Sequence, residues 1–458
     1  MFVGFDYGSA NCSVGVMENE QFRLLPLSKD SSFLSSTLYA LDRELICEAV
    51  LKGLPQSAQS EYRQLRRGQL AKAAHARREL DLAPDEQAVF VGEQAIEAYL
   101  DMPDEGFYVR SPKSFLGAVG LRADQMSLFE DIVTLMMQYI KGQAEMHLPE
   151  GQRITKAVIG RPVNFQGIGG EQSNQQAEAV LRIAAKRAGF EDVAFLFEPI
   201  AAGMDYEARL KENKTVLVVD VGGGTTDCSV VKMGPGHCQS QNRHDDFLGH
   251  SGQRIGGNDL DIALSMAAFM PHLGLGSLMM NQLPMPNQPF WNAVAVNDVS
   301  AQRDFSSLSA RKLIESLIKD AQEPERLSRL LKVQQQQLGY QIVRSAESAK
   351  IALSSDDDVT VDLSYIEVGV KAKVSETLFE NAIDMPLSRI EALMDEALDQ
   401  AKAVPKVIYV TGGTARSPAI YRKIASLHPN VPIVVGDHFS SVTAGLTRWA
   451  HKIFSVSP

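Results

Sequence analysis

The stretch Val216–Met233, VLVVDVGGGTTDCSVVKM, joins two apolar runs through an aspartate and a glycine-rich turn. A similar string stands near the N-terminus, where Val3–Val16 reads VGFDYGSANCSVGV. Apolar runs on both sides of a short Gly-rich turn predict a β-hairpin. Two copies of strand, Asp-x-Gly turn and strand, about half a chain apart, indicate an internal duplication of large domains.

Strands and helices alternate after each hairpin. In the first half, the apolar pattern predicts strands at Lys156–Ile159 and Val193–Phe197 and a helix at Glu171–Ala188. In the second half, Ser375–Ala403 reads as one long helix and Val407–Val410 as a strand that leads into Thr-Gly-Gly. This alternation predicts an α/β fold made of two duplicated lobes.

The two predicted lobes cover residues 1–213 (lobe I) and 214–458 (lobe II). Two stretches break the α/β pattern, at about 28–104 and about 272–337, and read as inserted helical subdomains. The second is rich in Met, Pro, Asn and Gln, and we expect Trp291 to lie in a loop there. Lobes and insertions together account for the whole length, so we expect no C-terminal peptide-binding domain.

Composition excludes several classes of protein. The chain has 458 residues, 45% of them hydrophobic, and a net charge of −11, which describes a globular protein and disfavours nucleic acid or an anionic membrane as the main partner. A basic segment at Arg63–Leu80 is more typical of a solvated helix face. With no long apolar run and four cysteines that form no CxxC pair, we expect a cytoplasmic protein.

The two glycine-rich turns serve one chemical need. Glycine lets the backbone approach a ligand closely, and a nest of backbone amides binds phosphate oxygens. Asp6 and Asp220 precede the turns at strand ends, where a carboxylate can hold hydrated Mg²⁺. The sequence contains neither the G-x-x-x-x-G-K-[ST] motif nor a complete G-x-G-x-x-G after a strand, which excludes a P-loop and the dinucleotide fingerprint.

The two hairpins, with Gly412-Gly413 after a third β-rich run, resemble the phosphate and adenosine motifs of the actin, sugar kinase and heat-shock ATPase superfamily. Within it, the chain most resembles the nucleotide-binding domain of DnaK-type heat-shock chaperones, and among these the truncated YegD-type proteins. Besides the hairpins, the similar segments are SPKSFLG (Ser111–Gly117), IGRPVNF (Ile159–Phe165), FEPIAAGMDY (Phe197–Tyr206), RIGGNDLD (Arg254–Asp261), AESAKIALSS (Ala346–Ser355) and VTGGTARSPAI (Val410–Ile420).

The resemblance implies duplicated actin-like (ribonuclease H-like) ATPase lobes around a nucleotide cleft. It also implies Mg²⁺-dependent ATP and ADP binding, slow ATP hydrolysis, a nucleotide-switched conformation and a protein partner or client. Three alternatives stay open: a nucleotide-gated protein-binding module with little hydrolysis, a small-molecule kinase of the same superfamily, and a filament former.

Site residues follow from the resemblance and from the charge that a γ-phosphate develops during hydrolysis. The expected catalytic residues are Lys113, Glu198, Asp220 and Thr225. The expected metal-binding carboxylates, acting mainly through water, are Asp6, Glu198, Asp220 and Asp227. The expected nucleotide-binding residues are Asp6, Gly8, Ser9, Ala10, Asn11, Gly222, Gly223, Gly224, Thr225, Thr226, Gly256, Gly257, Asn258, Glu347, Lys350, Ser354, Gly412, Gly413, Thr414 and Arg416.

Four positions depart from the family pattern. Ser9 and Ala10 stand where the family usually has two threonines, so the phosphate cradle lacks one hydroxyl. Thr226 replaces a common aromatic residue, and Phe439 stands where an aspartate is expected, with Asp437 two residues earlier. These departures leave nucleotide binding as the expectation and leave the rate of hydrolysis and interdomain coupling open.

Overall fold

The first of two large sheets contains both strands of the N-terminal hairpin. In the computed structural model, which describes residues 1–102, 105–118, 120–165, 170–238, 244–436 and 440–455, its strand order is β3-β2-β1-β8-β9, with β4 also paired to β2. Strands β1, β8 and β9 are parallel to one another, and β2 and β3 are antiparallel. The strands are β1 (Phe2–Tyr7), β2 (Asn11–Glu18), β3 (Gln21–Leu24), β4 (Phe33–Ser35), β8 (Lys156–Arg161) and β9 (Asp192–Phe197).

The second sheet repeats this arrangement. Its order is β12-β11-β10-β15-β16, again an antiparallel hairpin whose first strand pairs in parallel with later strands. Residues 216–219 of the central strand β10 form a continuous apolar run that is fully buried, as in strands covered on both faces. The strands are β10 (Lys214–Val221), β11 (Thr226–Met233), β12 (Phe247–Gln253), β15 (Val407–Thr411) and β16 (Ile433–Val435). Two mixed sheets of one topology agree with the predicted α/β fold.

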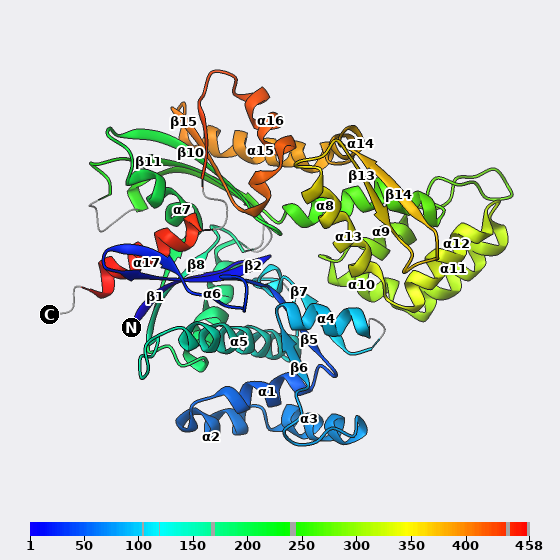
Figure 1. The fold of residues 1–458 in the computed structure, drawn as a ribbon, viewed down its shortest axis with the longest axis horizontal. Helices are drawn as coiled ribbons and strands as arrows, with labels where there is room; N and C mark the ends of the chain where they lie inside the picture. Colours follow the sequence, from blue (N-terminus) through cyan, green and yellow to red (C-terminus); the bar gives the residue numbers. More distant parts are fainter. Residues whose placement is uncertain (103–104, 119, 166–169, 239–243, 437–439, 456–458) are drawn as a thin grey trace.

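Two helices lie between the sheets (Figure 1). Helix α7 (Glu198–Glu207) starts with Pro199 in its first turn, as expected for a proline that follows a strand. Its Ala201 packs with residues of the first sheet and with α17 (Ser441–Phe454), whereas its Ala202 packs with residues of the second sheet. Helix α17 follows the second sheet in the chain but packs on β1. The lobe boundary at residue 213 stays a prediction.

Outside the two predicted insertions, the other helices pack on the sheets or on one another. Helices α5 and α6 pack together in the core of the first sheet, and α15 packs on β11 and β12 of the second. These helices are α5 (Ala123–Met146), α6 (Gly170–Arg187), α8 (Gly257–Leu264), α13 (Gly339–Ala352), α14 (Glu376–Ala382), α15 (Asp384–Ala401) and α16 (Pro418–Leu427). The predicted long helix at Ser375–Ala403 is wrong in one respect, because it is divided at Ile383 into α14 and α15.

Each predicted insertion forms a projecting part of the molecule (Figure 1). The first contains helices and two strands of a three-stranded sheet, namely β5 (Thr37–Ala40), α1 (Leu45–Gly53), α2 (Gln56–Leu65), α3 (Arg67–Glu79), β6 (Val89–Val91) and α4 (Glu93–Asp101). The third strand of this sheet, β7 (Phe107–Arg110), lies just after the predicted insertion. The second contains α9 (Gln288–Val294), α10 (Val299–Phe305), α11 (Leu308–Asp320) and α12 (Pro324–Gln335), and the hairpin of β13 (Asp358–Asp362) and β14 (Lys371–Ser375) follows α13. Trp291 lies in α9, so its predicted loop is wrong: Pro289 starts a helix there.

No helix in the described part of the chain is long and apolar enough to cross a membrane.

Candidate functional site

A cavity of about 460 Å³ lies where the turns of the two hairpins meet. Its walls come from both sheets, from α8 and α13, and from the turn after β15. Most of the nucleotide-binding residues expected from sequence line it: Asp6, Gly8, Ser9, Ala10, Asn11, Gly222, Gly223, Thr225, Gly257, Asn258, Glu347, Lys350, Ser354, Gly412, Gly413, Thr414 and Arg416. Glu198 and Asp220 line it as well. Segments more than 400 residues apart in the chain therefore meet in one place.

The two turns approach each other closely. A Cβ added at Gly223 would lie 2.5 Å from the Cβ of Ala10, so a side chain at position 223 would push the two turns apart. The turn at Gly222 is closed by its own amide, which donates to the carbonyl of Thr225 at 2.9 Å. Two amides of α8 donate to this turn: Gly257 to the carbonyl of Gly222, and Asn258 to that of Gly223. Small residues are required where the turns meet.

Some of the expected residues lie beside the cavity without lining it: Lys113, Gly224, Thr226, Asp227 and Gly256. The hydroxyl of Thr226 donates to the carbonyl of Ile255 at 2.8 Å, and the side chain is fully buried. Lys113 is buried, and its ammonium pairs with the carboxylate of Glu198. Lys113 belongs to a short 3-10 helix that follows Ser111, whose backbone is left-handed (φ 55°).

Four carboxylates cluster around this one lysine. Asp227 lies directly opposite Asp220 in the β10–β11 pair, a position at which two like charges repel each other. Burial, with the charge of Glu198, raises the pKa of Asp220 to about 7. Burial and Glu198 raise the pKa of Asp6 to about 7 as well. Burial, Glu198 and Asp220 raise the pKa of Asp227 well above its usual range. The cluster thus carries more negative charge than Lys113 neutralises.

The charge of Lys113 is itself stabilised. Burial alone would lower its pKa, but the carboxylates of Glu198 and Asp6 act more strongly, and the pKa lies above its ordinary value. Lys113 therefore remains an ammonium at neutral pH.

The carboxylate cluster fits a hydrated divalent cation. One buried oxygen of Asp227 accepts no hydrogen bond in the structure, and a nearby cation would relieve the repulsion that raises these pKa values. Among the described residues, no three His, Cys, Asp or Glu side chains are arranged to hold a metal ion directly. The residues therefore fit Mg²⁺ held mainly through water, because this ion keeps much of its hydration shell.

The opposite end of the cavity is formed around α13. Glu347 and Lys350 lie on this helix, and Ser354 lies just after its end. The ammonium of Lys350 is 2.6 Å from the carboxylate of Asp261. The carboxylate of Glu347 is 3.1 Å from the guanidinium of Arg110, which belongs to β7. Both side chains are thus held in position by charged partners.

The sequence did not lead us to predict six further residues that line the cavity: Phe33, Asp261, Ile351, Ser355, Ser417 and Val442. Asp261 is the last residue of the RIGGNDLD segment. It follows Gly257 by one helical turn, and this spacing could have predicted that both residues face the cavity. Phe33 belongs to β4, inside the segment assigned to an insertion, and nothing local indicated its role. Asp437 and Phe439 lie outside the described residues.

Comparison with known proteins agrees with this architecture. Residues 118–270 match the family model described as Hsp70 protein. Chaperone protein DnaK of Thermus thermophilus is 28% identical over 309 residues, which are 65% of this chain and 39% of that protein. Chaperone protein dnaK of Thalassiosira pseudonana is 26% identical over 313 residues, which are 66% of this chain and 40% of that protein.

A third similar protein matches a larger share of the chain at lower identity. Chaperone protein dnaK3 of Synechococcus elongatus is 24% identical over 366 residues, which are 77% of this chain and 40% of that protein. The matched region spans about two-fifths of the length of these relatives. The two mixed sheets of this α/β protein are consistent with the actin-like ATPase lobes of Hsp70 proteins. The chain is therefore distantly similar to Hsp70 and DnaK proteins over its matched regions.

Proposed function

We propose that the chain binds Mg-ATP and Mg-ADP in the cavity between the two sheets, hydrolyses ATP slowly, and changes conformation with nucleotide state. One observation carries the proposal. Two Asp-x-Gly turns, a buried lysine with its glutamate, and a helix carrying Glu347 and Lys350 come together around one cavity of about 460 Å³. A cavity of this size on which polar groups converge is typical of a small-ligand site.

In this proposal the phosphates lie between the turns at Ala10 and Gly223, where backbone amides and small side chains leave room for oxygen atoms. Asp6, Asp220, Asp227 and Glu198 hold the hydration shell of Mg²⁺, which neutralises phosphate charge when bound. The ammonium of Lys113 adds a fixed positive charge close to the phosphate end, and the hydroxyl of Thr225 is a donor for a phosphate oxygen or the attacking water.

The nucleoside end is assigned to α13 and the turn after β15. Glu347 and Lys350 present an acceptor and a donor for the ribose, and Asp261 keeps the lysine in place. Arg416 is exposed at the wall of the cavity, and its planar guanidinium can stack on the base.

The proposal also covers the subtype of the protein, its compartment and its partner. We infer a YegD-type protein that acts in the cytoplasm, with the lobes as its switching unit and a protein partner that distinguishes the ATP state from the ADP state.

A second candidate, a nucleotide-gated binding module with little hydrolysis, is favoured by two observations. Ala10 supplies no hydroxyl to the cavity wall, and Lys113 is paired with Glu198 without lining the cavity. Turnover separates the two candidates, because both require Mg-dependent nucleotide binding.

Calorimetry with ATP and ADP, each with Mg²⁺ or with EDTA, tests binding. We expect saturable binding that weakens at least about tenfold in EDTA, since the carboxylates then face the phosphates without a cation. Absence of binding under all four conditions would contradict both candidates.

Single-turnover hydrolysis tests catalysis. Lys113→Ala and Asp220→Ala are expected to slow it by at least about 100-fold, because each removes a charge that acts on the reacting phosphate. The matched controls are Lys371→Ala and Asp358→Ala, both exposed on the β13–β14 hairpin. Unchanged hydrolysis in the Lys113 variant would remove this residue from the mechanism, and faster transfer of labelled γ-phosphate to a metabolite than to water would favour a kinase.

A further inference from the structure

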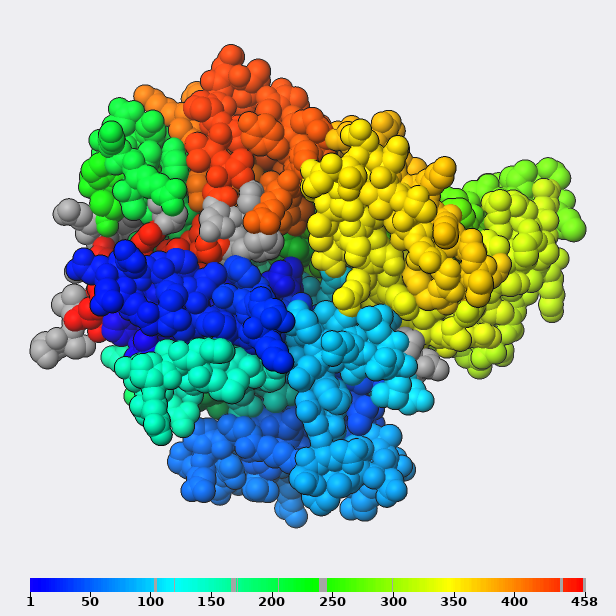
Figure 2. All heavy atoms as spheres, viewed as in Figure 1, coloured from blue at the N-terminus to red at the C-terminus, as the bar shows by residue number. Residues whose placement is uncertain are grey.

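A second cavity, of about 660 Å³, lies between the first insertion and the helical part that follows β12. One side is formed by α1, α3, β7 and the start of α5, and the other by α9, α10 and the start of α13. Figure 2 shows the cyan surface of the first insertion against the yellow surface that includes α13. This cavity shares no lining residue with the 460 Å³ cavity.

Aromatic rings from both sides line this second cavity. Tyr99 and Tyr108 stack with their ring centres 4.5 Å apart, and Tyr340 of α13 meets the Tyr108 ring edge-on at 4.9 Å. Phe115 and Phe129 form another stacked pair at 5.7 Å. Such rings offer flat apolar faces and edges against which another aromatic ring packs favourably.

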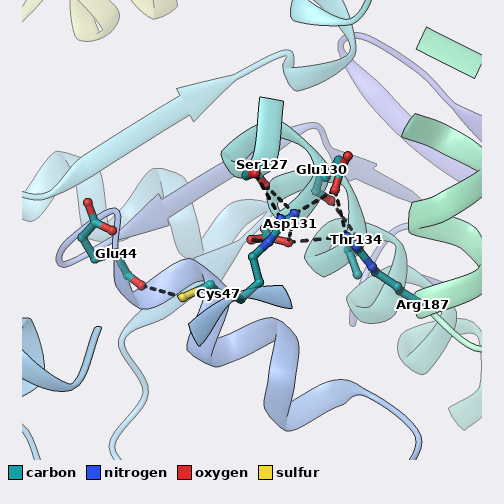
Figure 3. A network of polar contacts seen from close by, with 8 residues as sticks. Glu44, Cys47, Ser127, Glu130, Asp131, Thr134 and Arg187 are labelled. Carbon is teal, nitrogen blue, oxygen red and sulfur yellow. Dashed lines mark hydrogen bonds and ion pairs between the residues drawn. The ribbon is translucent and has the colours of Figure 1, made fainter. Parts of the chain in front are cut away.

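The floor of the second cavity is held rigidly by a buried charge network (Figure 3). Asp131 lines the cavity, and its carboxylate accepts from the guanidinium of Arg66 at 2.9 and 3.2 Å. Arg66 also donates to Glu130 at 2.7 Å and to the hydroxyl of Ser127 at 3.0 Å. The negative charge of the floor is therefore neutralised within the protein, and the start of α3 is fixed on α5. A wall fixed in advance reduces the cost of binding.

Most charged side chains at the rim pair with their own neighbours. Arg43 lies 3.3 Å from Glu44, and Arg122 lies 3.1 Å from Asp124. These pairs leave little net charge for a ligand.

Two cations on opposite sides are the exception. Lys72 of α3 has no ion-pair partner among the described residues, and Arg303 of α10 has only the adjacent Asp304, at 3.8 Å. Against them stands one rim carboxylate, Glu105, which also has no ion pair in the described part of the chain. Asp304 and Glu105 together balance the two cations in number, so it is the position of Lys72 and Arg303 on opposite sides of the aromatic walls that favours an anionic group.

We propose that this second cavity is a binding site for a flat aromatic molecule that carries a single negative charge. The rings of Tyr108, Tyr340 and Phe129 contact the aromatic body, and Lys72 and Arg303 attract the anionic group from the two sides. The volume is in the range of cavities that enclose small organic ligands.

The probe for this site is anilinonaphthalenesulfonate, an aromatic monoanion whose fluorescence rises in apolar surroundings. Calorimetry and fluorescence titration of the intact chain are expected to show saturable binding of one molecule per chain. Gly68→Phe is the blocking variant, because Gly68 lines the cavity in α3 and a Cβ there meets no atom within 4 Å. Gly142→Phe is the matched control, since Gly142 in α5 has equally open surroundings and lies outside the cavity.

We expect Gly68→Phe to weaken binding of the probe at least about tenfold, because its ring occupies volume that the ligand needs. Gly142→Phe is expected to bind like the unchanged protein. Equal affinity in the two variants, or the lack of a saturable site, would overturn the proposal.

The charge of the ligand is tested with Lys72→Glu. This variant is expected to weaken binding of anilinonaphthalenesulfonate about two- to fivefold, as for a solvent-exposed ion pair, and to leave unchanged the binding of phenylnaphthylamine, which has the same rings without the sulfonate. Lys373→Glu, exposed on β14, is the control. Equal effects of Lys72→Glu on both probes would contradict the anionic class.

Discussion

At the scale of single residues, the candidate site is defined by charges that face each other across strand pairs. Asp220 and Asp227 are opposite each other in the β10–β11 hairpin, where the matching pair of the first hairpin is Asp6 and Ser13. Ser13 instead binds the hydroxyl of Thr443 at 2.6 Å. The duplicated hairpins are therefore alike in backbone and different in charge, which concentrates the carboxylates on one side of the cavity.

Asp220 makes stability depend on pH. Its folded-state pKa of about 7 lies above the ordinary value of 3.8, so the folded chain holds a proton that the unfolded chain releases. The contribution of Asp220 to stability is complete at low pH and is lost as pH rises through about 7. In EDTA, the stability advantage of Asp220→Asn over the unchanged protein is expected to grow between pH 5 and pH 8 by on the order of 2 kcal/mol.

Urea unfolding from pH 5 to 8 measures this difference in unfolding free energy. Asp358→Asn, at an exposed strand position, is the control. If the unfolding free energies of Asp220→Asn and the unchanged protein change with pH in parallel, burial of the Asp220 carboxylate does not destabilise the folded chain.

At the scale of helices and strands, α7 and α17 hold the two sheets together. The helices cross at Gly445, where an added Cβ would collide with the backbone of Ala201. Gly445→Ala is expected to lower the free energy of unfolding by about 3 kcal/mol, because backbone atoms cannot move aside as a flexible side chain would. Gly142→Ala, a helical glycine with open surroundings, should stabilise by up to about 1 kcal/mol. Denaturant titration compares them, and equal effects would exclude tight packing at the crossing.

Helices α2 and α3 depend on one buried arginine. Arg66, 4% exposed, neutralises Asp131 and Glu130 of α5. Arg66→Ala is expected to cost about 3 to 5 kcal/mol, because it leaves buried carboxylates without their partner. Arg67→Ala, at the adjacent exposed position, should stay within about 0.5 kcal/mol. Thermal and urea unfolding measure both, and a small effect at Arg66 would mean that Arg187 alone neutralises the network.

At the scale of the whole molecule, strand β7, which follows the first insertion, contacts the far side of the 460 Å³ cavity. Arg110 of β7 pairs with Glu347 of α13, so one residue of the candidate nucleoside site is held from across the cleft. Opening of the cleft must break this ion pair. Under the proposed function, a bound nucleotide and this ion pair stabilise the same closed arrangement.

If the proposed function holds, Arg110→Ala is expected to speed ADP release about two- to fivefold. This factor corresponds to the interaction free energy of a partly exposed ion pair. Stopped-flow displacement of a fluorescent ADP measures the rate. The control is Arg422→Ala, which removes pairs with Glu376 and Glu380 within the second half of the chain. Equal release rates in the Arg110 and Arg422 variants would exclude the ion pair as a restraint on cleft opening.

Much of the fold was predictable because its signals are local. Hairpins at Val3–Val16 and Val216–Met233 follow from apolar runs around Gly-rich turns, and the order of later strands and helices follows from periodicity. Most predicted nucleotide-contacting residues line one cavity. The two Gly-rich turns indicated some of these residues locally, and the resemblance to DnaK-type chaperones implied the others. Two predictions were wrong. Pro289 starts a helix around Trp291 in a stretch whose composition is typical of a loop, and a short break at Ile383 divides a stretch that is helical in composition throughout.

Tertiary structure alone decided which charges meet. Lys113 and Glu198 are 85 residues apart, and Lys350 and Asp261 pair across 89 residues, so no local pattern links either pair. The folded chain also decided that Thr226 turns its hydroxyl toward Ile255, and that a second, aromatic cavity forms between parts distant in sequence. Turn chemistry and periodicity act over a few residues, whereas burial and ion pairing depend on distances that exist only once the chain has folded.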